Sequence, residues 1–394
     1  MYDLLLKGGF VIDPDQGVHS RIDVAIKDGT IAHLGEGILQ NEAKQVLDVS
    51  GKYVSPGLVD LHTHVYWGGT PLGINPDKVG GESCVTTFVD AGSAGAGNFV
   101  GFKDYVIDRS KVTIYPFLNI SYLGLAGAVY DPDHYVILGE TFNLKYAMVA
   151  ATVELGRAYP DLIKGVKVRI SLESSGDQGI KPLLLALRAA EEMERPVMVH
   201  IGMPPPSRRE VLPLLRKGDI LTHSFVGGYN SPLDRKGKII PEMLDARERG
   251  VIMDLGHGGS SFSFEVAEKL FAQGFRPDTI SSDIHLPIRG FHPHWPGMPD
   301  VNQPVVLSKM LSLGMEIDDV IEAATHTPAE VIGCADQIGT LREGSIADIA
   351  VFEIEEGTFE FPEHARGKVI CHKRFTPRLT LLKGEVIFNG LCGR

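Results

Sequence analysis

Residues 56–64 have the sequence Pro-Gly-Leu-Val-Asp-Leu-His-Thr-His, an apolar run that ends in two histidines. A short apolar run bounded by Pro and Gly predicts a strand that is buried on both faces. Residues two apart in an extended chain point to the same side, so the imidazoles of His62 and His64 can both reach one ion. The segment therefore predicts a buried strand that presents two candidate metal ligands at its C-terminal end.

Seven more apolar runs of similar length follow, and helix-like stretches such as residues 181–194 and 264–273 separate most of them. The expected strands are residues 57–61, 86–90, 114–120, 165–170, 197–200, 220–223, 251–255 and 279–282. Buried strands that alternate with helices indicate parallel crossovers, and eight such units predict an α/β fold of the (β/α)8 TIM-barrel type. The other arrangement, an open doubly wound sheet, lacks the Gly-x-Gly-x-x-Gly nucleotide fingerprint after its first strand here.

The two ends of the chain have sequence patterns that are typical of short strands. Asp28 and Gly29 interrupt an alternating stretch and predict a hairpin, because both residues tolerate positive φ. Residues 346–354 and 380–388 are also strand-like, whereas the Thr-Pro-Ala-Glu pattern at residues 327–330 predicts the start of the last helix. The expected domains are a small β-sandwich domain formed by residues 1–55 plus 345–394, and a barrel formed by residues 56–344.

Composition narrows the class of protein. The chain has 394 residues and a formal net charge of -12, and an acidic surplus argues against a nucleic-acid partner. No apolar run approaches the ~20 residues that a membrane span needs. The four cysteines form no C-x-x-C pair and no disulfide framework, which suits a reducing compartment. We expect a cytoplasmic enzyme with a small-molecule substrate, and a homo-oligomer is a reasonable assembly for it.

Candidate ligands also lie at the ends of later predicted strands. His200, His223 and Asp283 each follow an apolar run, and active sites of such barrels lie at the C-terminal ends of strands. A buried carboxylate such as Asp283 is costly unless it is paired or bound to a metal. Singly, each histidine is as compatible with a hydrogen-bonded core position as with a metal site. The ordered set is much more specific than its members and predicts a metal centre.

Lys167 lies inside the apolar run at residues 165–170. The plain interpretation is a lysine that faces outward or lies at the end of the strand, with Lys164 as a competing surface lysine. The alternative is a buried side chain whose pKa is lowered by desolvation. A neutral amine can react with CO₂ to give a carbamate, which is anionic and able to bridge two metal ions.

Several motifs together resemble the amidohydrolase superfamily, in its dihydroorotase-like, binuclear branch. They are residues 56–64, the Cys-Val-Thr-Thr-Phe-Val-Asp-Ala-Gly-Ser sequence at 84–93, the candidate ligands, and the Gly-Thr-Leu-Arg-Glu-Gly-Ser-Ile-Ala-Asp-Ile-Ala-Val sequence at 339–351. The resemblance covers nearly the whole chain. More narrowly, the sequence is similar to the amidohydrolase/deacetylase subgroup, some of whose members remove an acetyl group from α-substituted carboxylates. Cys84 departs from the glycine frequent at this position, and we interpret it as a core residue.

The resemblance implies a role for each ligand. His62 and His64 bind one divalent ion with Asp283, while His200 and His223 bind a second. A carbamate on Lys167 and a hydroxide bridge the two ions, for which zinc is the usual metal. Asp283 takes the proton of the hydroxide and passes it to the leaving group. The implied reaction is hydrolysis of an amide or acetyl ester of a small α-substituted carboxylate.

Substrate contacts are expected in the loops that follow the strands. Arg289 is either a bidentate anchor for a substrate carboxylate or a solvated loop residue. Two histidines in the Pro-rich loop are at most lid or substrate contacts. These two loop histidines are His292 and His294. The remaining expected contacts are His257, His285 and Tyr122.

Three other functions remain as alternatives. Hydrolysis of a cyclic amide, as in dihydroorotase or hydantoinase relatives, requires the same ligands. Deamination is less favoured, because mononuclear deaminases of the superfamily lack the bridging lysine and carry a Glu three residues after a strand-end histidine. Here His200 is followed by Ile-Gly-Met, and His223 by Ser-Phe-Val. A non-catalytic scaffold is disfavoured because all six candidate ligands are present.

Overall fold

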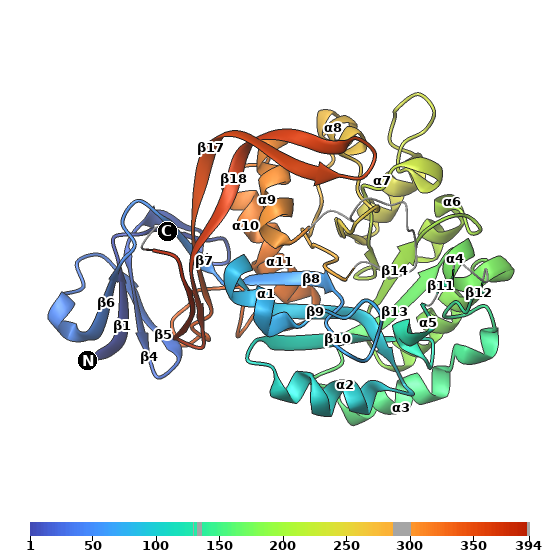
Figure 1. Ribbon diagram of the computed structural model, residues 1–394, viewed down its shortest axis with the longest axis horizontal. Coiled ribbons are helices and arrows are strands. Elements are labelled where there is room, and N and C mark those ends of the chain that lie inside the picture. The colour runs from blue at the N-terminus through green and yellow to red at the C-terminus, as the bar shows by residue number, and fades with distance from the viewer. Residues whose placement is uncertain (129, 132–135, 287–300, 392–394) are drawn as a thin grey trace.

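The computed structural model describes residues 1–128, 130–131, 136–286 and 301–391. Its larger part is a curled parallel sheet with helices on the outside, and its smaller part contains sheets from both ends of the chain (Figure 1). Among the described helices, none combines the length and the apolar character that a membrane span requires.

Seven parallel strands form the central sheet, in the order in which they occur along the chain. They are β8 (Leu58–Thr63), β9 (Val85–Gly95), β10 (Thr113–Asn119), β13 (Gly165–Ile170), β14 (Val197–Ile201), β15 (Ile220–Leu221) and β16 (Ile252–Met253). Their residues are almost entirely buried, as the continuous apolar runs predict.

The eighth expected strand, residues 279–282, forms only isolated parallel bridges. Thr279 pairs with Asp254 beyond β16, and Ile284 pairs with Thr63 of β8. The sheet therefore curls back on itself, with this segment between its first and last strands. Backbone hydrogen bonds still join the two segments, from Leu255 N to the Thr279 carbonyl and from His257 N to the Ser281 carbonyl. The hydroxyls of Thr279 and Ser281 also donate to the Asp254 carboxylate. The strand expected at residues 220–223 also ends early, because His223 has a φ of 56°.

Helices cover the outside of the curled sheet (Figure 1). They are α1 (Pro76–Ser83), α2 (Phe99–Tyr105), α3 (Val149–Ala158), α4 (Leu172–Ser175), α5 (Lys181–Glu192), α6 (Arg208–Val211), α7 (Pro241–Glu248), α8 (Phe264–Ala272), α9 (Gln303–Ser312), α10 (Ile317–Ala324) and α11 (His326–Val331). In α5 the buried face contains Leu183, Ala186 and Ala190, at the spacing of an amphipathic helix.

The start expected for the last helix, with Thr327 as the cap, is wrong by two residues, and the expected capping box is absent. Helix α11 begins at His326 and follows α10 after Thr325 alone. The Thr325 hydroxyl donates to the Ile321 carbonyl of α10 instead of capping α11. Thr327 lies inside the helix, so the pattern at residues 327–330 has no free helix end to cap.

Both ends of the chain contribute to two further sheets. A four-stranded sheet has the order β5-β4-β1-β6, and a six-stranded sheet has the order β19-β18-β17-β7-β2-β3. Leu4 and Ile26 from the first sheet share one buried cluster with Val351 and Leu379 from the second. The strands are β1 (Tyr2–Lys7), β2 (Phe10–Asp13), β3 (Val18–Arg21), β4 (Asp23–Lys27), β5 (Thr30–Gly35), β6 (Ala43–Asp48), β7 (Tyr53–Pro56), β17 (Ile349–Glu363), β18 (Gly367–Leu382) and β19 (Glu385–Asn389). A separate short hairpin comprises β11 (Tyr130–Asp131) and β12 (Val136–Ile137).

Strands β17 and β18 are much longer than the sequence indicated. They leave the six-stranded sheet as a long hairpin that crosses the outside of α9 (Figure 1). The Phe375 amide donates to the Ser308 hydroxyl at 2.9 Å, and the Lys309 ammonium donates to the Pro362 carbonyl at 2.6 Å. These contacts attach the C-terminal strands to the helical layer around the central sheet.

The hairpin predicted at Asp28 and Gly29 is confirmed, because β4 and β5 pair on either side of it and both turn residues have positive φ. A Cβ on Gly29 would lie 3.0 Å from the Lys383 carbonyl oxygen. We expect Gly29→Ala to lower the free energy of unfolding by about 2 kcal/mol, from left-handed strain plus overpacking. The control is Gly17→Ala, because Gly17 has a φ of 63° but open space around the new methyl group. Left-handed strain alone should lower the free energy of unfolding of this variant by about 1 kcal/mol. Urea denaturation measures both, and equal midpoints would contradict the packing argument.

Candidate metal centre

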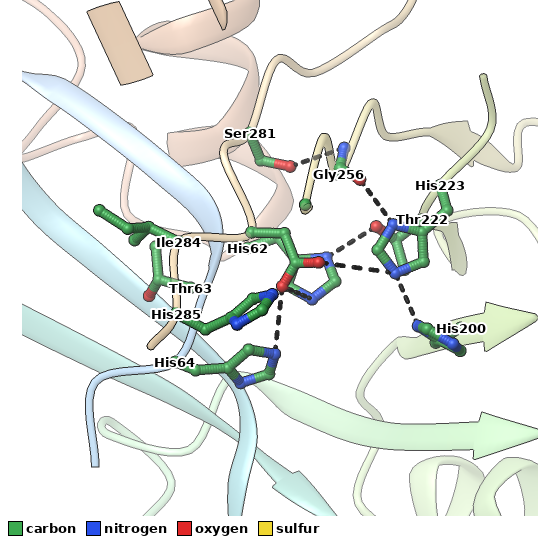
Figure 2. A network of polar contacts seen from close by, with 12 residues as sticks. His62, Thr63, His64, His200, Thr222, His223, Gly256, Ser281, Ile284 and His285 are labelled. Atoms are coloured by element: carbon green, nitrogen blue, oxygen red, sulfur yellow. Dashed lines mark hydrogen bonds and ion pairs between the residues drawn. The ribbon is translucent and has the colours of Figure 1, made fainter. Parts of the chain in front are cut away.

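The six candidate ligands converge at the C-terminal end of the central sheet. One lies in β8 and one directly after it, one each lies in β13 and β14, and two lie in the segments after β15 and after residue 282. Figure 2 shows that the imidazoles of His62, His64, His200 and His223 point toward one another. Five of the six side chains are buried and His200 is half-buried; in chain order they are His62, His64, Lys167, His200, His223 and Asp283.

The first half of the centre is built around Asp283. Its Oδ1 atom lies 3.2 Å from His64 Nε2 and 3.4 Å from His62 Nε2. One ligand atom from each of these three residues lies within 4.8 Å of the others. Asp283 Oδ1 is buried and has no hydrogen-bond partner in the described part of the chain. A buried carboxylate oxygen beside two ring nitrogens fits a divalent cation that accepts mixed N/O ligands.

The second half contains the other two histidines, and the lysine lies nearby. His200 Nδ1 lies 2.6 Å from His223 Nε2, and His223 Nε2 lies 4.0 Å from Asp283 Oδ2. Lys167 Nζ lies 3.2 Å from His62 Nε2, which places the lysine beside the first half. The carboxylate of Asp283 therefore faces both groups of nitrogen ligands.

The outer nitrogen of His62 is held by a chain of hydrogen bonds. Thr222 Oγ1 donates to Asp254 Oδ2 at 2.7 Å, so its lone pair is left to accept from His62 Nδ1 at 2.7 Å. His62 then carries its proton on Nδ1 and presents the Nε2 lone pair to the centre. Such outer contacts fix ring orientation and raise the basicity of the ligand nitrogen.

Two other rings are oriented in the same way. His223 Nδ1 faces the Gly256 carbonyl at 2.5 Å, which can only accept, so the proton lies on Nδ1 (Figure 2). His64 Nδ1 lies 3.1 Å from the Ser93 hydroxyl. In all three histidines the Nε2 atom is therefore the one turned toward the centre.

Burial controls the charge of these groups. Desolvation lowers the pKa of His62, His64 and His200 and brings that of His223 to about 3, so the imidazoles are neutral near pH 7. Desolvation also lowers the pKa of Lys167 to about 7. These are the protonation states that metal binding and carbamate formation require.

Asp283 behaves in the opposite sense. Burial raises the pKa of its carboxyl, whereas the positive charge that His62 and His64 carry when protonated lowers it, and the net direction is well below the usual range. The ionised carboxylate is therefore favoured wherever positive charge, from protonated rings or from a cation, lies beside it.

The backbone at two ligands lies in the left-handed region. His223 has a φ of 56° and Asp283 a φ of 49°, conformations that non-glycine residues seldom adopt. A Cβ on Gly258 would lie 2.5 Å from Asp283 Oδ2, so only glycine allows the adjoining loop to approach the carboxylate. Strain of this kind concentrates at functional sites, where surrounding contacts hold it in place.

A cavity of about 500 Å³ opens over the ligands, a size that suits a small molecule. His62, His64, Lys167, His200 and Asp283 form part of its wall. Other lining residues include Arg169, Glu173, Met203, Tyr229, Asn230, Ser260 and His285.

The expected substrate contacts separate into three groups. His285 lines the cavity, as expected, with its ring 6.2 Å from that of His64. The structure does not place Tyr122 or His257 among the lining residues: Tyr122 is exposed, and His257 is buried with Nε2 2.8 Å from Lys309 Nζ. Three of the predicted contacts lie outside the described residues: Arg289, His292 and His294.

Sequence reasoning missed Arg169 and Glu173, which both line the cavity. Strand alternation was the available signal for Arg169, because it follows Lys167 by two residues in the same strand. Cys84 is fully buried beside the Thr380 hydroxyl, and burial raises the pKa of its thiol to about 12, so the core interpretation is confirmed.

Comparison with known proteins identifies the family. Residues 265–387 match the model of the Amidohydrolase family. The chain is 36% identical over 361 residues to a protein of Brucella anthropi named deacetylase. The aligned region covers 92% of this chain and 86% of that protein. The chain belongs to the amidohydrolase superfamily. The resemblance inferred from the motifs is thus confirmed.

Two solved structures share the fold of this amidohydrolase over nearly its whole length. One, described as an adenine deaminase, has a TM-score of 0.86 and 31% identity. The match covers 98% of this chain and 99% of the chain in that structure. The other, described as a dihydroorotase, has a TM-score of 0.85 and 34% identity. The match covers 99% of this chain and 98% of the chain in that structure. The curled parallel sheet agrees with the barrels of such neighbours.

The Thr222 hydroxyl provides a test of the outer contacts in this amidohydrolase. Thr222→Val removes the donor to Asp254 and the acceptor for His62 without changing side-chain shape. We expect metal affinity to fall about 10- to 100-fold, because the ring loses its fixed orientation. Titration with a competing chelator measures the change. Thr222→Ser keeps the hydroxyl and should retain most of the affinity; equal losses in both variants would contradict the argument.

Proposed function

We propose that this amidohydrolase is a binuclear, metal-dependent hydrolase that cleaves an amide or acetyl ester of a small α-substituted carboxylate. The observation that carries the proposal is the convergence of all six candidate ligands beneath one cavity of about 500 Å³. Similarity to proteins named deacetylase supports the acyl substrate.

Two divalent ions, for which zinc is our first expectation, would occupy the centre. His62, His64 and Asp283 would hold one ion, and His200 and His223 the other. When bound, such ions lower the pKa of a shared water molecule and polarise the scissile carbonyl. The N/O ligand set suits zinc without requiring it.

Lys167 would join the two halves as a carbamate. Its neutral amine adds to CO₂, which forms an N–C bond and releases one proton to give an anionic carbamate with two oxygen ligands. Burial supports this chemistry, because it lowers the pKa of Lys167 to about 7 and makes the neutral amine available.

Asp283 would serve as the proton shuttle. Its carboxylate is ionised, faces both pairs of histidines and has one oxygen without a hydrogen bond. It can take a proton from the attacking water and deliver it to the leaving amine or alcohol. The close approach of Gly258 to the carboxylate leaves little space for a side chain on that side.

A cyclic amide substrate is the second candidate. The 34% identity to a structure described as a dihydroorotase favours it, and the same ligands would serve both reactions. Deamination has less support, although one neighbour is described as an adenine deaminase, because neither His200 nor His223 is followed by Glu at the third residue. The full set of ligands also speaks against a non-catalytic scaffold.

We also retain the finer architecture as part of the proposal. Residues 56–344 would form a complete (β/α)8 barrel, with residues 279–282 as its irregular eighth strand. Residues 1–55 plus 345–394 would form a β-sandwich domain, which the cluster shared by the two end sheets supports.

Lys167→Ala tests the bridge. We expect it to lower the metal bound per chain by about half or more, because the shared ligand is lost. Elemental analysis after dialysis measures this. Lys164→Ala is the matched control. Lys164 is three residues from Lys167 in the sequence, but its ammonium lies over the Tyr115 ring and not among the histidines. Unchanged metal content in Lys167→Ala would exclude a bridging carbamate on this residue.

Asp283→Asn tests the proton shuttle together with the reaction. Metal-reconstituted protein should be screened against N-acetyl amino acids and O-acetyl α-hydroxy acids of both hands, beside dihydroorotate and hydantoins. We expect turnover of an acyclic acyl substrate, and a loss of about 10²- to 10⁴-fold in kcat for Asp283→Asn. Turnover of only cyclic substrates would favour the second candidate. A fully active variant would remove Asp283 from the shuttle role.

A further inference from the structure

Arg169 lies next to the centre by strand register. It follows Lys167 by two residues in β13, so both side chains extend from the same face of the strand. In the adjoining strand its register partner is His200. Arg169, Lys167 and His200 all line the same cavity. The guanidinium therefore belongs to the wall of the site, beside the second pair of ligands.

The guanidinium is held at one end. Arg169 Nη1 donates to Glu140 Oε1 at 2.7 Å, and the Glu140 side chain is only 3% exposed. The Arg169 side chain is 20% exposed, and its Nε and Nη2 atoms have no hydrogen-bond partner within the described ranges. One buried carboxylate thus orients the group and leaves further N–H donors for another acceptor.

Charge also distinguishes this residue. Among the described lining residues outside the six ligands, Arg169 is the permanently charged cation, and Glu173 is the carboxylate. An arginine in a partly desolvated wall binds a carboxylate more strongly than a solvated surface arginine, since less competing water surrounds it. The cavity therefore offers one strong position for an anionic group.

We propose that Arg169 binds the carboxylate of the substrate and so determines the specificity of the enzyme. This assignment rests on the proposed function, because it places the acyl carbonyl over the ligands. Adjacent strands lie about 5 Å apart, so the carboxylate position and the ligand His200 are close neighbours. That short span matches an acylated α-hydroxy or α-amino acid, in which the carboxylate and the scissile group share one carbon atom.

Binding measurements test the assignment without requiring turnover. The probes are lactate and its neutral analogue lactamide, titrated calorimetrically into the metal-loaded protein. We expect Arg169→Met to weaken lactate binding about 10- to 100-fold, as for loss of a charged hydrogen-bonded pair, and to leave lactamide unchanged. Arg169→Lys should be intermediate, because it keeps the charge but loses the planar fork.

Controls separate this role from a structural one. Arg188→Met on α5, where the side chain is 69% exposed, should leave lactate binding unchanged. Metal content must match the wild type in each variant. Lactate binding that is absent from the wild type, or that survives in Arg169→Met, overturns the assignment. So does an equal loss for lactate and lactamide, which would indicate general damage to the site.

Kinetics distinguish failure of the anchor from failure of the proposed function. With N-acetylalanine and N-acetylalaninamide, Arg169→Met should raise KM for the acid about 10-fold or more while that for the amide stays constant. If the wild type hydrolyses no acyl substrate but binds lactate through Arg169, the proposed function fails and the anchor stands. If it hydrolyses the acid with the same KM in Arg169→Met, the anchor fails and the function stands.

Discussion

The buried carboxylate of Asp283 is the constraint on which the rest of the site depends. An ionised carboxylate in a protein interior is costly unless positive charge or donors surround it. Here the protein supplies ring nitrogens at 3.2 and 3.4 Å and leaves Oδ1 without a hydrogen bond. Neutral imidazoles do not fully compensate such a charge, whereas divalent cations would. Under the proposed function, bound metal would stabilise this arrangement and would link the stability of the region to its chemistry.

Other buried aspartates hold the ligands from behind. The Asp60 carboxylate of β8 accepts from the Ser282 amide and hydroxyl, so the first strand is joined to the segment that carries Asp283. Burial raises the pKa of Asp60 to about 7. Asp254 accepts three hydroxyl donors from the next strand segments: Thr222, Thr279 and Ser281. The same hydrogen bonds therefore close the curled sheet and hold the segments that carry the candidate ligands.

The sequence alone determined a large part of the site. Five of the six candidate ligands lie at the end of an apolar run and Lys167 lies inside one, and both the residue type and its position in the run are local features. Parallel strands bring their carboxyl ends to one edge, so local positions were sufficient to predict convergence. The turn at Asp28 and Gly29 was equally local, because its φ values depend on those two residues.

Only the tertiary structure decided which neighbouring residues face the cavity. His257 follows a strand like the ligands, yet Lys309 from α9 holds it away from the cavity wall. Arg169 is oriented by Glu140, which lies 29 residues earlier in the chain. The long β17–β18 hairpin likewise depends on contacts with α9. These outcomes rest on partners distant in sequence, and no local pattern encodes which distant group will meet a given side chain.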